Sequence, residues 1–321
     1  MSVSTRGTSG KRPGSRIGGP SEPATCTADQ PLRPRRGTPC EDRAHVLADA
    51  KAAVTYLLGR DDPVHRLRPS LASGLAAVLV AAGLVLTLQL GSGIPLRAWS
   101  SSERAIVLTE ILPAAVAAVV LLAFVGWARW DAVRRDPFRL PTSPFVLAVV
   151  ALASLAVLAR LALADWGAPT ARVLALLALS AAVTGVAEEL ALRGVLLRSL
   201  RVGRRPEIVA ALGTTAASAV LQVPVLAFTA RGFGPVDVAV AVALGALLYL
   251  VRRATRTLVA AVALHLAWDL GTLVDRAGDG AALTGPAAVV AVVVVALVTW
   301  AFVATARGDR TRRALVDPRL A

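Results

Sequence analysis

The 321-residue chain is both hydrophobic and basic: 55% of its residues are hydrophobic, 17% are charged, and the formal net charge is +14. A mean hydropathy of +0.63 excludes an ordinary soluble domain and predicts a membrane protein. The arginines lie in a tail and between apolar blocks, without interleaved aromatic residues, so they do not indicate a nucleic-acid partner. Both cysteines, Cys26 and Cys40, lie in the polar N-terminal tail, so neither a disulfide framework nor a cysteine-based metal site is indicated.

The N-terminal segment divides into two parts. Residues 1–42 are rich in Arg, Pro, Gly, Ser and Thr and carry almost no apolar periodicity, so we expect a disordered, basic tail. In residues 43–60 apolar side chains recur at helical spacing. This pattern predicts a short amphipathic helix, which either lies on the membrane surface or packs on the bundle from the cytosol.

Apolar blocks of roughly twenty residues follow, which is the length that a helix needs to cross about 30 Å of hydrocarbon. They cover residues 71–91, 105–127, 144–164, 172–198, 208–229, 235–251, 256–274 and 285–305. Helices are expected because lone strands would leave backbone groups unpaired in lipid. The predicted fold is all-α, a polytopic bundle of about eight transmembrane helices over residues 71–305, followed by a basic tail at 306–321.

Positive charge alternates along the connections between these blocks. The N-terminal tail, the second, fourth and sixth connections and the C-terminal tail are rich in arginine, whereas the odd-numbered connections carry few positive charges. The positive-inside rule then predicts a multi-pass protein of the cell membrane with both termini in the cytoplasm. No internal repeat of the kind found in many transporters is evident.

The fourth block contains ionisable residues deep in the bilayer, where each charge costs at least about 2.5 kcal/mol on insertion scales. Glu189 and Arg193 are four residues apart on one helix face and are expected to form an ion pair with a structural role. Glu188 lies about 100° further round the helix, without an obvious partner in its own block. Glu188 is therefore the stronger candidate for chemistry.

The seventh block places His265 and Asp269 four residues apart, again on one face. At about 1.5 Å per residue, Glu188 and His265 both lie some 14 Å from the predicted cytoplasmic face, so they can meet if their helices pack together. Gln222, in the fifth block, lies somewhat deeper but within reach. We expect these three blocks to build one polar site inside the membrane, reached by water from the cytoplasmic side.

Other charges, Glu110, Arg160 and Asp237, lie near the predicted outer ends of their blocks. Snorkelling or local pairing accounts for them, so no chemistry is assigned to them.

Two of the motifs resemble those of a known family. Glu188, Glu189 and Arg193 match Glu-Glu-x-x-x-Arg, and His265 with Asp269 matches His-x-x-x-Asn/Asp. These motifs are similar to those of the CPBP intramembrane endopeptidases, which include the type II CAAX prenyl proteases and bacterial bacteriocin-processing or self-immunity proteins. The resemblance covers roughly residues 172–275.

Between these motifs the sequence departs from the family pattern. The helix around Gly245 resembles the family's glycine-containing helix, but residues 218–224 stand where the family has Phe-x-x-x-His followed closely by Leu-Pro. Gln222 takes the place of that second histidine. The only other histidines, His45 and His65, precede the first block and cannot replace it.

The resemblance implies hydrolysis of peptide bonds in membrane-associated peptides or proteins. Glu188 would be the general base that activates a water, while the histidine positions orient that water and stabilise the oxyanion. Gln222 can hold a water or donate a hydrogen bond, but its amide does not titrate.

Three interpretations follow. In a variant enzyme, Glu188 and His265 carry the proton transfers while Gln222 positions the water. A non-catalytic relative would bind membrane segments without cutting them, and a transporter would use Glu188 as a proton or cation site. No cofactor is expected, and one histidine with carboxylates does not favour a catalytic zinc, which normally has three protein ligands.

Overall fold

The computed structural model describes residues 65–95, 98–99, 102–136, 140–167, 169–202, 205–227, 235–277 and 286–316. All of them belong to the second of two compact units, Val46–Ala321. The predictions for residues 1–42 and 43–60 therefore lie outside the described residues.

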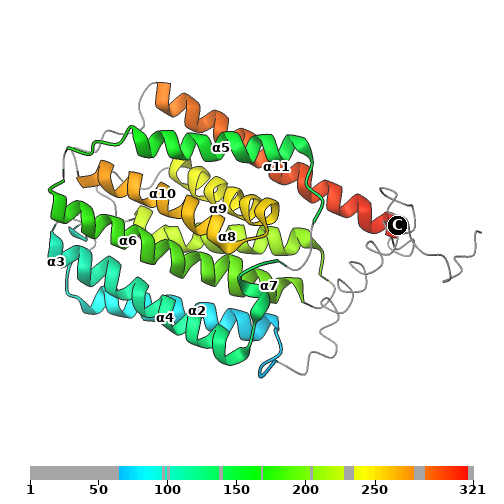
Figure 1. The fold of residues 1–321 in the computed structure, drawn as a ribbon, viewed down its shortest axis with the longest axis horizontal. Coiled ribbons are helices and arrows are strands. Elements are labelled where there is room, and N and C mark those ends of the chain that lie inside the picture. Colours follow the sequence, from blue (N-terminus) through cyan, green and yellow to red (C-terminus); the bar gives the residue numbers. More distant parts are fainter. Residues whose placement is uncertain are drawn as a thin grey trace, which may run out of the picture. The chain divides into compact units, whose positions relative to one another are not determined.

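Helices make up the described part of the chain (Figure 1). In chain order they are α2 (Leu71–Gly91), α3 (Glu103–Ile106), η2 (Val107–Ile111), α4 (Leu112–Ala128), η3 (Asp131–Val133), α5 (Pro144–Ala162), α6 (Ala171–Glu189), η4 (Leu190–Leu196), α7 (Leu197–Arg201), α8 (Glu207–Ala227), α9 (Pro235–Thr255), α10 (Leu258–Ala277) and α11 (Pro286–Val316). The elements η2 and η4 are π-helical, and η3 is a 3-10 turn.

Within the described residues, 6 helices are long and apolar enough to cross a membrane. They cover Leu71–Gly91, Glu103–Ala128, Pro144–Ala162, Ala171–Arg201, Asp237–Thr255 and Leu258–Asp275. A shorter apolar helix covers Glu207–Gln222 in α8. The predicted all-α, polytopic bundle is confirmed, and the protein is a multi-pass membrane protein.

The helix boundaries differ from the predicted blocks mainly at the C-terminal end. The last block was expected to end at 305, but α11 continues as a helix to Val316. Asp309 in this extension bonds Arg253 of α9 at 2.8 Å, so the helix is tied to the bundle beyond the apolar block. The beginning of the segment predicted as a tail is thus helical.

Short polar residues set the starts of several helices. The hydroxyls of Ser70, Ser143 and Thr170 accept hydrogen bonds from backbone N–H groups in the first turns of α2, α5 and α6. These bonds satisfy donors that a helix N-terminus leaves without intrahelical partners. Helix α4 ends where Arg129 adopts a left-handed conformation with φ 57.

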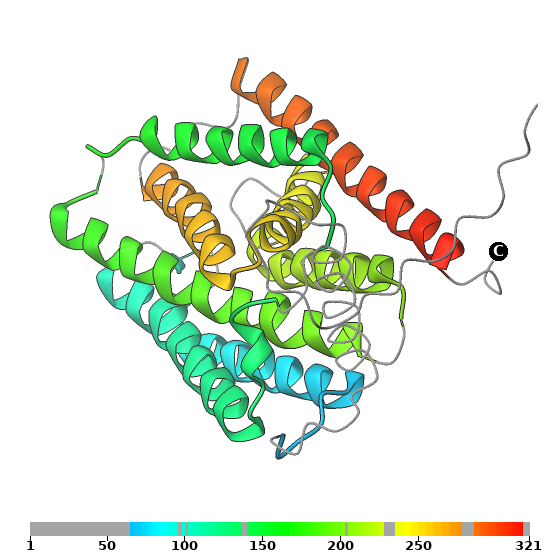
Figure 2. The same ribbon diagram turned by 45° about the vertical axis from the view of Figure 1, so that its right-hand side comes forward.

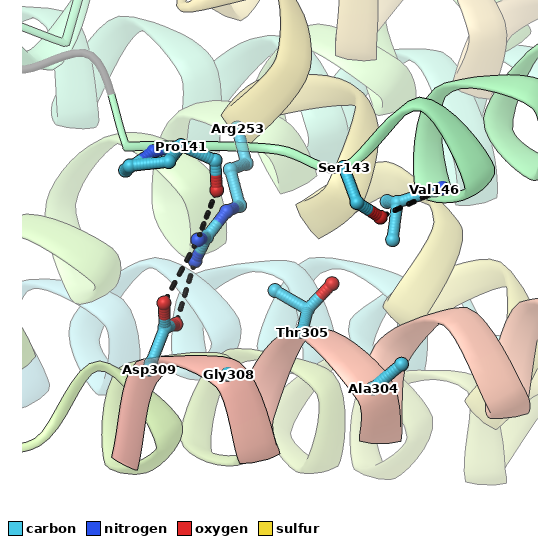
Figure 3. A pocket seen from close by; sticks show the side chains of 8 residues that line it. All are labelled: Pro141, Ser143, Val146, Arg253, Ala304, Thr305, Gly308 and Asp309. Atoms are coloured by element: carbon cyan, nitrogen blue, oxygen red, sulfur yellow. Dashed lines mark hydrogen bonds and ion pairs between the residues drawn. The ribbon is translucent and has the colours of Figure 1, made fainter. Parts of the chain in front are cut away.

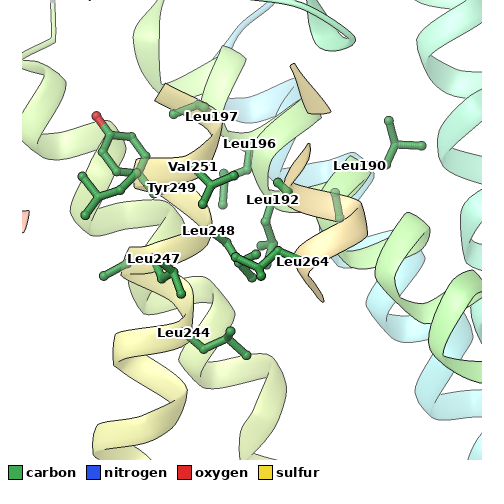
Figure 4. Packing of buried hydrophobic residues seen from close by; sticks show 14 of the residues in the cluster. Leu190, Leu192, Leu196, Leu197, Leu244, Leu247, Leu248, Tyr249, Val251 and Leu264 are labelled. Carbon is green, nitrogen blue, oxygen red and sulfur yellow. The ribbon is translucent and has the colours of Figure 1, made fainter. Parts of the chain in front are cut away.

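Helix α10 packs between α5 and α6, as Figures 1 and 2 both show. Gly185 permits the close approach of α6, because a Cβ there would lie 3.5 Å from the backbone nitrogen of Leu266. Small residues at helix crossings allow this kind of packing in membranes. The neighbouring apolar core joins η4, α7, α9 and α10 through buried leucines such as Leu192, Leu248 and Leu264 (Figure 4).

The arginine-rich second, fourth and sixth connections meet in space. Asp136, which follows α4, lies 3.0 Å from Arg201 at the end of α7 and 3.2 Å from Arg252 near the end of α9. Arg201 also bonds Glu207, at the start of α8, at 2.7 Å. These connections therefore lie at one common end of the bundle, as the alternation of charge in the sequence requires.

A cavity of about 110 Å³ lies where α11 meets the end of α9 and the start of α5 (Figure 3). It is lined by Pro141, Ser143, Val146, Arg253, Ala304, Thr305, Gly308 and Asp309. Arg253 is held there by both carboxylate oxygens of Asp309 and by the carbonyl of Pro141 at 2.9 Å. The cavity contains none of the predicted site residues.

Candidate active site

The ion pair predicted in the fourth apolar block is present, between the end of α6 and η4, and it is fully buried. Arg193 Nη1 lies 2.9 Å from Glu189 Oε1, and both side chains are 0% exposed. Arg193 Nη2 donates a second hydrogen bond, at 2.7 Å, to the carbonyl of Gly245 in α9. The guanidinium thus fixes Glu189 and also ties α9 to the end of α6.

Glu189 has a second partner that the helix periodicity does not reveal. His265 Nδ1, on α10, lies 2.9 Å from the same Oε1 atom of Glu189. A carboxylate that already accepts a hydrogen bond from Arg193 is an acceptor only, so Nδ1 is the donor in this contact. The hydrogen bond fixes the ring orientation and leaves His265 Nε2 on the opposite side of the ring.

His265 Nε2 faces two further carboxylates. It lies 3.7 Å from Glu188 Oε2 and 3.5 Å from Asp269 Oδ2, and it makes no hydrogen bond within the described residues. The same oxygen of Glu188 accepts a hydrogen bond from the amide Nε2 of Gln222 at 3.4 Å. Glu188, Gln222 and His265 therefore meet, and they come from α6, α8 and α10.

Burial separates the site into two layers. The side chains of Glu189, Arg193 and His265 are at most 1% exposed, whereas Glu188 is 21% and Asp269 19% exposed. The inner layer is a chain of hydrogen-bonded charges, which keeps the cost of burying them low. The outer layer carries the carboxylates that a water or a substrate can reach.

The π-helical segment η4 begins immediately after Glu189 and covers Leu190–Leu196. Single π-helical turns inside α-helices occur frequently at functional sites, because they shift the direction in which nearby side chains point. Here Arg193 lies within the segment, and its guanidinium reaches α9 while still contacting Glu189. The sequence contains no signal that would have located this segment.

Residues 170–271 match the family model described as type II CAAX prenyl endopeptidase, Rce1-like. This part of the chain is Rce1-like. The match confirms the resemblance to the CPBP endopeptidases that the motifs indicated, and the family that this segment resembles is one of membrane proteases. No curated protein and no solved structure matches the chain.

The Rce1-like segment covers about a third of the chain, from the start of α6 to the middle of α10. It contains all of the predicted site residues: Glu188, Glu189, Arg193, Gln222, His265 and Asp269. The structure brings these side chains into one connected group. Within the described residues, no three histidine, cysteine, aspartate or glutamate side chains are arranged to hold a metal ion.

Glu110 and Arg160, which were predicted to lie near span ends, are both paired with residues of other helices. Glu110 accepts a hydrogen bond from Ser180 of α6 at 2.7 Å, which is consistent with the pairing expected near a span end. Arg160 pairs with Asp275 of α10 at 3.0 Å, although 115 residues separate them. The pairing of Arg160 is therefore between helices, and it involves the helix that carries His265.

Proposed function

We propose that the protein is an intramembrane endopeptidase that hydrolyses peptide bonds of membrane-associated proteins by activating a water with Glu188. The observation that carries this proposal is the position of Glu188, half-buried and within 3.7 Å of His265 Nε2. The Rce1-like match to residues 170–271 supports the same reaction class.

In the proposed reaction, a water beside Glu188 Oε2 gives a proton to the Glu188 carboxylate, and the water oxygen bonds to the scissile carbonyl carbon. The resulting oxyanion accepts hydrogen bonds from donors already in place, for which the amide of Gln222 and a protonated His265 Nε2 are suited. Collapse of the intermediate breaks the C–N bond. The leaving amine takes a proton either from Glu188 directly or from His265 Nε2, which then regains a proton from Glu188.

Asp269 and Glu189 support His265 in this scheme. Glu189 holds Nδ1 at 2.9 Å, and Asp269 lies 3.5 Å from Nε2, so a positive charge on the ring would be stabilised from both sides. This arrangement favours a His265 that transfers protons at Nε2 over a His265 with a purely structural role. Proton transfer by His265 compensates in part for the missing second histidine, because Gln222 can orient a water but cannot exchange a proton.

We also propose that the protein resides in the cell membrane with both termini in the cytoplasm. The meeting of the arginine-rich connections at one end of the bundle, through Asp136, Arg201 and Arg252, supports this orientation. The substrate would then be a membrane-tethered peptide, and the family description makes one with a prenylated C-terminal motif the first to test.

The test is cleavage of a membrane-tethered peptide by the purified protein in liposomes, with a prenylated and an acyl-anchored version of the peptide. We expect Glu188→Gln and His265→Gln to abolish cleavage while thermal unfolding stays cooperative. Glu103→Gln removes a carboxylate at the far end of the bundle and serves as the matched control. Cleavage that survives both site substitutions would exclude the proposed mechanism.

A second candidate is a non-catalytic relative that binds membrane segments, and Gln222 in place of a histidine is the observation that favours it. In that case the wild-type protein would bind the tethered peptide, and Glu188→Gln would leave binding unchanged. Binding without cleavage of any tethered peptide would select this alternative.

A further inference from the structure

Arg160, near the C-terminal end of α5, contacts three residues of α10. Its Nη1 donates to Thr272 Oγ1 at 2.8 Å, and its Nη2 donates to Asp275 Oδ2 at 3.0 Å. The guanidinium carbon also lies 4.7 Å from the centroid of the Trp268 ring. The side chains of Arg160 and Asp275 are 24% and 31% exposed, so this ion pair is partly shielded from solvent.

These three partners lie beside the catalytic face of α10. At about 100° per residue, Asp269 lies about 40° to one side of His265, whereas Thr272, Trp268 and Asp275 lie about 20° to 80° to the other side. One polar face of α10 is therefore shared between two neighbouring helices. The edge of this face that carries Asp269 is directed towards Glu188 of α6. The edge that carries Thr272, Trp268 and Asp275 contacts Arg160 of α5.

The backbone of α10 approaches those of α5 and α6 closely, at points five residues apart along α10. A Cβ on Gly271 of α10 would lie 3.4 Å from the Cα of Leu161, the residue after Arg160. On the α6 side, a Cβ on Gly185 would lie 3.5 Å from the backbone nitrogen of Leu266. Glycines let α10 pack closely against its neighbours. Because a glycine has no side chain, such a contact does not by itself fix the rotation of the helix about its axis.

We propose that Arg160 is a positioning residue for the active site. Its three contacts fix the rotation of α10 about its own axis, and that rotation determines whether His265 Nε2 points at Glu188. Arg160 and Asp275 both lie outside the Rce1-like segment 170–271, so the site depends on a helix that the family match does not include. The inference rests on the proposed function.

The substitutions that test it are Arg160→Gln, which removes the charge, and Arg160→Lys, which keeps a cation beside Trp268 and Asp275. Arg172→Gln is the control, because it breaks an arginine–glutamate pair of 3.0 Å at the exposed start of α6. A misplacement of about 1 Å can cost roughly a hundredfold in rate, so we expect Arg160→Gln to lower kcat by at least about tenfold with KM little changed. Arg160→Lys should recover most of kcat, and Arg172→Gln should behave as wild type.

A second readout does not require activity. With His45 and His65 replaced by glutamine, His265 is the only histidine, and its ring nitrogens can be observed by ¹⁵N NMR. We expect Arg160→Gln to shift the Nε2 resonance, Arg160→Lys to restore it, and Arg172→Gln to leave it unchanged. If Arg160→Gln leaves the Nε2 resonance unchanged, the positioning role is overturned. If the wild-type protein shows no Glu188-dependent cleavage, the proposed function is overturned instead, and the NMR result alone decides on Arg160.

Discussion

His265 Nδ1 lies 2.9 Å from Glu189 Oε1, and this contact joins the buried ion pair of α6 to the helix that carries the proposed catalytic histidine. The spacing along the helix predicts Glu189 as the partner of Arg193. Glu189 accepts hydrogen bonds from Arg193 and His265 through one oxygen. The stability of this region and the orientation of the histidine are therefore coupled through a single carboxylate.

Removal of Arg193 should destabilise the fold strongly. Arg193→Met leaves the buried carboxylate of Glu189 without its cation and frees the carbonyl of Gly245, and breaking a buried pair in this way costs about 3–5 kcal/mol. Thermal or denaturant unfolding in detergent measures the loss. Arg172→Gln, which breaks the exposed pair with Glu103, should cost no more than about 1 kcal/mol. Equal stability of the two variants would exclude the structural role of Arg193.

Replacement of Gln222 by histidine should raise peptidase activity. The amide of Gln222 already contacts Glu188 at 3.4 Å, so an imidazole at this position would meet the same carboxylate and add a group that titrates. General acid–base groups typically contribute at least about a hundredfold to rate, and we expect a gain in kcat of about tenfold or more. Gln222→Asn, which shortens the amide, is the control and should lower the rate. A Gln222→His protein no faster than wild type would argue against a catalytic role for this position.

Addition of a methyl group at Gly245 should separate α8 and α9. A Cβ on Gly245 would lie 3.1 Å from Ser218 Cβ and 3.2 Å from the carbonyl oxygen of Thr215, and a backbone atom cannot move aside easily. We expect Gly245→Ala to cost about 1–3 kcal/mol of unfolding free energy, as overpacking typically does. Gly83→Ala is matched to it, because nothing lies within 4 Å of a Cβ added there. In a helix interior Gly83→Ala should be neutral or stabilising by up to about 1 kcal/mol.

The native cysteines report the predicted orientation. The chain has 2 cysteines, Cys26 and Cys40, and both precede the first span. A maleimide that cannot cross membranes should label them in inside-out vesicles and leave them unlabelled in right-side-out vesicles. Labelling after detergent addition checks that both thiols are reactive. Labelling of intact right-side-out vesicles would place the N-terminus outside and reverse the proposed topology.

Much of this arrangement followed from local sequence features. Block length and apolar composition predicted the membrane helices, because the thickness of the bilayer sets how many residues a span requires. The four-residue spacings of Glu189 with Arg193 and of His265 with Asp269 predicted pairs on one helix face, because α-helix geometry fixes that relationship. The cost of a charge in lipid singled out Glu188.

Only the tertiary structure decided which helices meet, because contacts between distant segments depend on packing and not on spacing along the chain. It brought Gln222 to Glu188, placed His265 against Glu189, and directed Arg193 to the carbonyl of Gly245. It also turned Arg160, which sequence depth alone assigned to a span end, towards α10. The sequence thus determined the membrane class and the residues able to do chemistry, while helix packing decided how those residues are joined into a site.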